Sequence, residues 1–139
     1  ESGTLNLPGI IGLNEGLAYI ESVGMETIHN HELALSKAFL EGLQDIEHIN
    51  VIGKQNLQDR TAVVSITIDG MDAASIAYEL ESTYHIMTRV GLHCAPRAHQ
   101  TLGTYPEGTV RFSFGYANTL EDVEAALSAL STIAKSYKE

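Results

Sequence analysis

The segment 62–68 constrains the fold of this chain more than any other stretch of its sequence. Apolar residues alternate there with Ser65 and Thr67. A period of two is typical of a β-strand that buries one face and exposes the other. Asp69-Gly70 follows this segment and supplies a turn. The chain is therefore expected to contain a sheet whose two faces differ in character.

Apolar residues recur at helical spacing on both sides of this strand. Helices are predicted over 10–22, 26–43 and 72–82 and from 119 onward, and further strands over 50–53, 85–89 and 109–114. Asp72 is a suitable N-cap, and Thr119 opens a sequence that approximates a capping box. The segment 91–104 is expected to be irregular, with a helical turn near 98–102. This order predicts an α+β fold with a small, mostly antiparallel sheet and helices packed on one face.

Composition is typical of a globular protein with a single domain. The chain has 139 residues, of which 44% are hydrophobic, and this is enough for a core without disulfides or metal. The formal net charge of −10 argues against a nucleic-acid surface and against docking on anionic lipid. The longest apolar stretches are too short to span a bilayer. We therefore expect a cytoplasmic protein that binds neither nucleic acid nor membranes.

The N-terminal end of the sequence does not resemble the start of a natural protein. Glu1-Ser2-Gly3-Thr4 contains no initiator Met and no basic segment followed by an apolar run. The sequence is therefore expected to be an excerpt from a longer protein.

Reactive side chains concentrate between Arg89 and Arg97. Cys94 is the single cysteine of the chain, so an intrachain disulfide is excluded. Cationic neighbours such as these, with His93 adjacent, stabilise a thiolate and make a cysteine nucleophilic. The alternative is a small buried hydrophobe. A metal site built from His93, Cys94 and His99 matches no standard zinc pattern, so no metal is expected.

Arg111 lies in the last predicted strand. If Val110 and Phe112 face the core, Arg111 points to the opposite face. An arginine there needs a partner, and its planar fork suits a carboxylate. That carboxylate belongs either to a ligand or to one of the 18 acidic residues of the chain, in a structural salt bridge.

The first loop of the chain offers a weaker candidate site. Gly3, Thr4 and Asn6 can present backbone N–H groups and a hydroxyl to a phosphate. The same residues also suit an ordinary linker, and the pattern alone does not decide between the two.

Three segments resemble the cysteine desulfurase and selenocysteine lyase branch of the class V aminotransferases. Residues 89–95 (RVGLHCA) are similar to the motif with the reactive cysteine in that family, and residues 108–113 (GTVRFS) to the strand with its substrate-binding arginine. Residues 1–4 (ESGT), followed by 9–13 (GIIGL), resemble the segment before its long helix. The three segments occur in the order of the family and extend over essentially the whole chain.

The resemblance implies the C-terminal small domain of a fold type I enzyme that depends on pyridoxal 5′-phosphate (PLP). Residues 1–24 would form a lead-in segment and a linking helix, and residues 25–139 the α+β small domain. The domain with the PLP lysine is absent. The lysines of this chain lie in polar helix or loop contexts that do not suit a cofactor lysine: Lys37, Lys54, Lys135 and Lys138.

The resemblance also implies roles for individual residues. Cys94 is expected to attack the sulfur of the cofactor-bound substrate and to hold it as a persulfide, with His93 beside the thiol. Arg111 is expected to bind the substrate α-carboxylate as a bidentate pair. Arg89 is expected to contribute to the same substrate site.

The implied partners are L-cysteine or a related amino acid, the protein's own PLP domain and a sulfur-acceptor protein, as in iron–sulfur cluster assembly. A second subunit is implied as well, because Gly3 and Thr4 would contact the PLP phosphate of the opposite subunit in a homodimer.

Two departures limit what the resemblance carries over. Leu92 replaces the first His of the motif, so no role is assigned to that His. Without the PLP lysine, the chain alone is expected to have no desulfurase activity. The alternatives are another class V aminotransferase or lyase, and a stand-alone α+β binding module in which Cys94 is buried.

Overall fold

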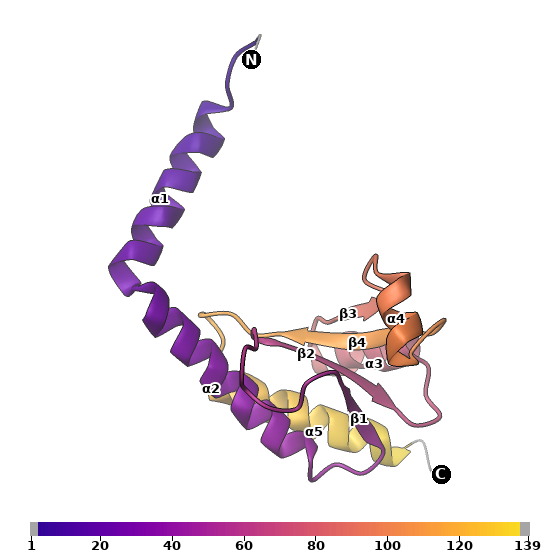
Figure 1. The fold of residues 1–139 in the computed structure, drawn as a ribbon. Coiled ribbons are helices and arrows are strands. Elements are labelled where there is room, and N and C mark those ends of the chain that lie inside the picture. Colours follow the sequence, from indigo (N-terminus) through magenta and orange to yellow (C-terminus); the bar gives the residue numbers. More distant parts are fainter. Residues whose placement is uncertain (1–2, 137–139) are drawn as a thin grey trace. The chain divides into compact units, whose positions relative to one another are not determined.

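The computed structural model describes residues 3–136 and arranges them as helices and a single sheet (Figure 1). The helices are α1 (Leu7–Val23), α2 (Met25–Leu43), α3 (Ala73–Tyr84), α4 (Pro96–Leu102) and α5 (Leu120–Ser136). The strands are β1 (Ile49–Ile52), β2 (Val63–Ile68), β3 (Arg89–Gly91) and β4 (Thr109–Ser113). None of the helices in this part of the chain is long and apolar enough to cross a membrane.

The four strands form one sheet in the order β1-β2-β4-β3, and every neighbouring pair is antiparallel. β2 and β4 are far apart in the sequence but lie side by side at the centre of the sheet (Figure 1). Their register places Ile66 opposite Val110 and Val64 opposite Phe112. The predicted antiparallel sheet of an α+β fold is confirmed.

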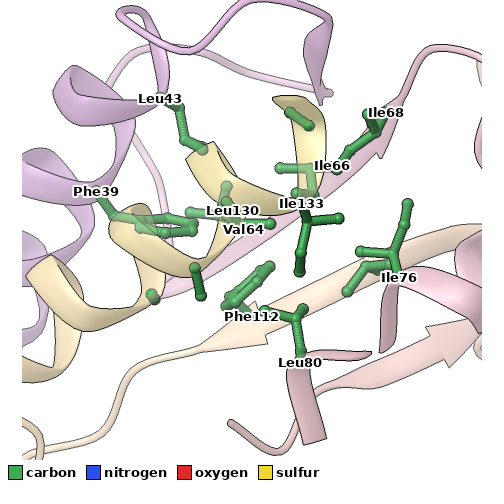
Figure 2. Packing of buried hydrophobic residues seen from close by; sticks show 14 of the residues in the cluster. Phe39, Leu43, Val64, Ile66, Ile68, Ile76, Leu80, Phe112, Leu130 and Ile133 are labelled. Carbon is green, nitrogen blue, oxygen red and sulfur yellow. The ribbon is translucent and has the colours of Figure 1, made fainter. Parts of the chain in front are cut away.

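One face of the sheet is buried beneath helices. Val64, Ile66 and Val110 lie on this face and are fully shielded from solvent. Helices α2, α3 and α5 contribute most of the other large side chains of the cluster (Figure 2): Phe39, Leu43, Ile76, Leu80, Leu130 and Ile133. Leu35 of α2 belongs to the same cluster. The Phe39 ring centroid lies 4.9 Å from that of Phe112, so α2 and β4 are packed directly together. Each large side chain buried in this way stabilises the fold by roughly 1.5–3 kcal/mol.

Side-chain caps determine where α3 and α5 begin. The Asp72 carboxylate accepts hydrogen bonds from the Ser75 hydroxyl and from the backbone N–H groups of Ala74 and Ser75. The bond from the Ser75 hydroxyl, followed by those from the backbone, holds the pKa of Asp72 below its usual value. Thr119 and Asp122 cap each other reciprocally, with N–H···O distances of 3.0 and 3.4 Å. Both predicted caps are confirmed.

The prediction of a strand over 85–89 is wrong. α3 continues to Tyr84, and His85 then ends it in a left-handed conformation with φ of 58°. The backbone N–H of Ile86 returns to the carbonyl of Leu80 at 2.9 Å, which closes the helix end. The strand therefore begins only at residue 89, four residues later than predicted.

The segment 91–104 is more regular than predicted. Pro96 occupies the first turn of α4. N–H groups in a first turn have no acceptor within the helix, so the N–H that proline lacks is not missed there. Gly103 ends the helix in a left-handed conformation with φ of 73°. The predicted helical turn near 98–102 is thus part of a longer helix, and a tight turn connects this helix to β3.

The chain divides into two compact units, one that ends at His31 and one that begins at Glu32. The second unit contains the sheet and the core. In the first unit, α1 is defined by local signals, since the Asn6 side chain accepts a hydrogen bond from the Gly9 N–H at 3.1 Å. α1 has no buried residue, and most of its large apolar side chains are 49% to 66% exposed: Leu7, Ile10, Ile11, Leu13, Leu17 and Tyr19.

Gly108 allows the chain before β4 to approach the end of β3. Its backbone is left-handed, with φ of 79°, and a Cβ atom built there would lie 2.3 Å from the carbonyl carbon of Gly91. Gly91 pairs in turn with Thr109. A side chain at position 108 would push this end of β3 away, and β3 leads directly into the segment with Cys94.

We therefore expect Gly108→Ala to lower the free energy of unfolding by more than about 2 kcal/mol. Left-handed strain alone costs roughly 1–2 kcal/mol, and the overlap with the backbone of Gly91 adds to it. Gly103→Ala is the matched control, because its φ of 73° is similar but no atom lies within 4 Å of the added Cβ. Urea denaturation of both variants checks this, and equal losses would show that the close approach is unimportant.

Candidate active site

Cys94 lies at the tip of a tight turn between β3 and α4. The N–H of Ala95 donates to the carbonyl of Leu92 at 2.8 Å and closes the turn. Its two central residues, His93 and Cys94, are both left-handed, with φ of 50° and 60°. This conformation usually requires glycine or asparagine and costs roughly 1–2 kcal/mol for each other residue. The Cys94 thiol is exposed, so the alternative of a buried hydrophobe is wrong.

The His93 ring is anchored to the strand that precedes the turn. Its Nε2 atom lies 3.1 Å from the carbonyl oxygen of Arg89. A carbonyl only accepts, so Nε2 carries the proton in this hydrogen bond, and Nδ1 is then the acceptor of a neutral ring. The structure thus places a potential proton acceptor in the residue next to the thiol.

Arg89 and Arg111 lie directly opposite each other on β3 and β4. On the other side of β4, Arg111 faces Ser65 of β2. Directly opposed residues share a face of the sheet, and here that face is the one opposite Val110. Two guanidinium groups are therefore held on neighbouring strands. Their like charges repel each other and destabilise this strand pair unless an anion binds between them.

The Arg111 guanidinium has unused hydrogen-bonding capacity. Its Nε atom is shielded from solvent and has no hydrogen-bond partner within residues 3–136. No carboxylate in the described part of the chain forms an ion pair with Arg111, so the predicted alternative of a structural salt bridge finds no partner among these residues. A buried, unpaired cationic donor is costly, and a planar carboxylate is the ligand that its geometry suits.

Two threonines beside the arginines are not among the site residues that the sequence predicts. The hydroxyl oxygens of Thr88 and Thr109 are also shielded and lack hydrogen-bond partners among the described residues. Thr109 lies two residues before Arg111 on β4 and hence on the same face. The alternation of β4 could have identified Thr109, but Thr88 precedes a strand whose start was predicted wrongly.

Gly3 and Thr4 belong to the N-terminal unit, whereas the other predicted site residues belong to the larger unit: Arg89, His93, Cys94 and Arg111. Both are exposed, and nothing lies within 4 Å of a Cβ atom built at Gly3. They are therefore open to contact a phosphate group. Glu1 and Ser2 of the same motif lie outside the described residues.

The described residues fit only part of a PLP site. PLP enzymes of this kind hold the cofactor through a lysine in a site that depresses its pKa. The lysines that the structure describes are all exposed, and Lys37 pairs with Glu41 at 3.8 Å. Gly3 and Thr4 fit an auxiliary contact to the phosphate, while the covalent attachment needs a residue from outside this part. Within the same residues, no group of three or more His, Cys, Asp or Glu side chains could hold a metal ion.

Known proteins resemble this chain along nearly its whole length. Residues 1–126 match the family described as Aminotransferase class-V. A probable cysteine desulfurase from Pyrococcus abyssi is 38% identical over 138 residues, which are 99% of this chain and 33% of that protein. A probable cysteine desulfurase from Mycobacterium leprae is 31% identical over 130 residues, which are 94% of this chain and 30% of that protein.

Solved structures share the fold. A cysteine desulfurase from Thermococcus onnurineus superposes with a TM-score of 0.91 at 38% identity, over 98% of this chain and 33% of that one. A cysteine desulfurase from Escherichia coli superposes with a TM-score of 0.84 at 25% identity, over 97% of this chain and 32% of that one. The chain spans about a third of the length of these relatives. It therefore belongs to the class-V aminotransferase family, in which these similar proteins are cysteine desulfurases.

Proposed function

We propose that this chain is the C-terminal part of a PLP-dependent cysteine desulfurase, in which Cys94 receives the sulfur atom of L-cysteine. Residues 1–24 form the lead-in segment and linking helix, residues 25–139 form the small domain, and the PLP lysine belongs to a part of the protein that this chain lacks. The observation that carries the proposal is the exposed thiol at the tip of a tight turn, directly after the strand that bears one of two opposed arginines.

The proposed reaction moves one sulfur atom. The Cys94 thiolate attacks the sulfur of L-cysteine, so that an S–S bond forms and the C–S bond of the substrate breaks. PLP, when bound, supplies the electron sink for the electron pair of that bond. A proton then adds to the β-carbon that has lost its sulfur, which gives L-alanine. L-cysteine and the Cys94 thiol thus give L-alanine and a Cys94 persulfide, and no external oxidant or reductant is required.

His93 accepts the thiol proton in this proposal. Its Nε2–H is engaged by the carbonyl oxygen of Arg89 at 3.1 Å, which leaves Nδ1 as the basic atom of the neutral ring. The same hydrogen bond restrains the ring. Because Leu92 stands where the family motif has its first His, His93 is the one imidazole within the turn itself.

Arg111 binds the substrate α-carboxylate, and Arg89 supplies a second positive charge. The buried, unpartnered Nε atom of Arg111 supports this assignment, since a bidentate carboxylate would satisfy it. A carboxylate held at this face would also relieve the repulsion between the two opposed guanidinium groups. The substrate is therefore held by its carboxylate end while its thiol end reaches Cys94.

Gly3 and Thr4 contact the PLP phosphate of the opposite subunit in the proposed homodimer. Their exposure and the open space at Gly3 support such a contact. The apolar side chains of α1 need a cover in the complete protein, because exposed apolar surface of this kind marks an interface. The cover we propose is the PLP domain together with the second subunit.

The persulfide on Cys94 has to be discharged onto a thiol or a protein that accepts sulfur. The exposed turn makes the sulfur accessible to such an acceptor. We propose that this acceptor serves iron–sulfur cluster assembly in the cytoplasm.

In the full-length protein, Cys94→Ser is expected to reduce alanine formation from L-cysteine by at least about 100-fold, because a hydroxyl is a far weaker nucleophile for sulfur. PLP binding, read from its absorbance, should be retained. The 139-residue chain alone, given PLP, is expected to form no alanine. Alanine formation at the wild-type rate by Cys94→Ser would favour a class V lyase in which Cys94 does not carry the sulfur, and activity of the chain alone would contradict its dependence on a lysine outside it.

Arg111→Lys in the full-length protein is expected to raise KM for L-cysteine by about 10- to 100-fold, since lysine keeps the charge but loses the bidentate fork. Arg97→Lys is the matched control, because Arg97 is exposed on α4 and is not paired across the sheet. Steady-state kinetics check both. An unchanged KM in Arg111→Lys would remove Arg111 from the carboxylate site.

Arg89→Thr in the 139-residue chain is expected to raise Tm slightly at low salt. Like charges directly opposite each other on a sheet destabilise it by roughly 0.2–1 kcal/mol, and the substitution removes one of them. The difference from the wild type should shrink at about 1 M NaCl, where the repulsion is screened. A lower Tm for the variant at low salt would show that the two arginines do not repel each other in the free protein.

A further inference from the structure

A buried histidine close to the Cys94 turn has no part in the mechanism above. His99 lies on α4 and is only 5% exposed. Its Nδ1 atom is 2.7 Å from the hydroxyl oxygen of Thr104, which is buried as well. A polar pair that is removed from solvent and hydrogen-bonded in this way restrains the elements that carry it.

The pair is connected to the turn along two routes. The His99 and His93 rings pack with centroids 5.7 Å apart and planes inclined by 39°, and His93 is itself bonded to the carbonyl of Arg89. Along the backbone, the N–H of His99 donates to the carbonyl of Ala95 at 3.2 Å. Both routes end on residues of the turn that carries the thiol.

The turn needs support from outside. Neither of its two left-handed residues is glycine or asparagine, and a single backbone hydrogen bond from Ala95 to Leu92 closes it. Strained backbone of this kind persists only where the surrounding structure enforces it. Within the described residues, the His99–Thr104 pair is the buried polar contact that adjoins the turn.

We propose that His99 is a positioning residue for Cys94. Thr104 fixes the His99 ring, the ring fixes His93, and the α4 backbone fixes Ala95, so that the thiol stays at an exposed tip. This inference rests on the proposed role of Cys94 as the sulfur acceptor, although the restraint on the turn can be tested without that reaction. His99 touches neither substrate nor cofactor.

Thr104→Val tests the proposal, because it removes the hydroxyl and keeps the shape of the side chain. Hydrogen exchange is measured in the full-length protein at the Ala95 amide, by fragmentation mass spectrometry at single-residue level. We expect Ala95 to exchange at least about 10-fold faster in Thr104→Val, whereas Thr104→Ser, which keeps the hydroxyl, should stay within about 2-fold of the wild type. The Phe114 amide, which donates to the carbonyl of Ala62 across the sheet, is the internal control and should not change.

Three outcomes would overturn the proposal. The first is a lower Tm for Thr104→Val with unchanged exchange at Ala95, because His99 would then only fill space. The second is an equal rise in the exchange rates of the Ala95 and Phe114 amides, because the variant would then have lost stability throughout the domain. The third is an Ala95 amide that is unprotected in the wild type, and this outcome needs no variant to fold.

The same variants separate this inference from the proposed function. Kinetics of the full-length Thr104→Val protein are expected to show kcat lowered by about 5-fold or more with KM changed by less than about 2-fold, since the carboxylate site on β4 is not touched. An unchanged kcat would count against positioning. Failure of the desulfurase reaction in the wild type would remove the proposed function, and hydrogen exchange at Ala95 would still decide whether the pair restrains the turn.

Discussion

The pairing of β2 with β4 at the centre of the sheet governs the rest of the structure. Alternate residues of β4 point into the core, so the residues between them must point to the other face. Val110 and Phe112 are buried under the helices, and Arg111 lies between them. A slip of one residue would turn Arg111 into the core and Val110 toward solvent. The register that packs Val110 and Phe112 into the core therefore also fixes the face on which Arg111 lies.

Periodicity in the sequence predicts the elements that obey this constraint. The alternation around Ser65 identified β2, and the same reasoning placed Arg111 on the face away from the core. Asp72 and Thr119 identified the starts of α3 and α5, since capping depends only on residues within one turn. The family resemblance selected Cys94 and Arg89 as well, and the structure places Arg89 on β3 and Cys94 in the turn that follows this strand.

Other features depend on contacts that periodicity does not encode. The opposition of Arg89 and Arg111 follows from the pairing of β3 with β4, two strands separated by the turn and α4. The His99–Thr104 hydrogen bond exists only because Gly103 ends α4 and returns the chain. The end of α3 was predicted wrongly, because Ile86 and its neighbours have the composition of a strand while the backbone closes the helix.

The exposed position of Cys94 has a consequence for how the protein must be kept. The chain contains no second cysteine, so every disulfide that Cys94 forms joins it to a cysteine outside these 139 residues or to a small thiol. Each such event occupies the same sulfur atom that the proposed reaction needs. In a solution exposed to air, the 139-residue chain is therefore expected to divide into free thiol, mixed disulfide and disulfide-linked pairs of chains. A reducing environment is thus the condition under which the exposed Cys94 thiol stays free for the proposed reaction.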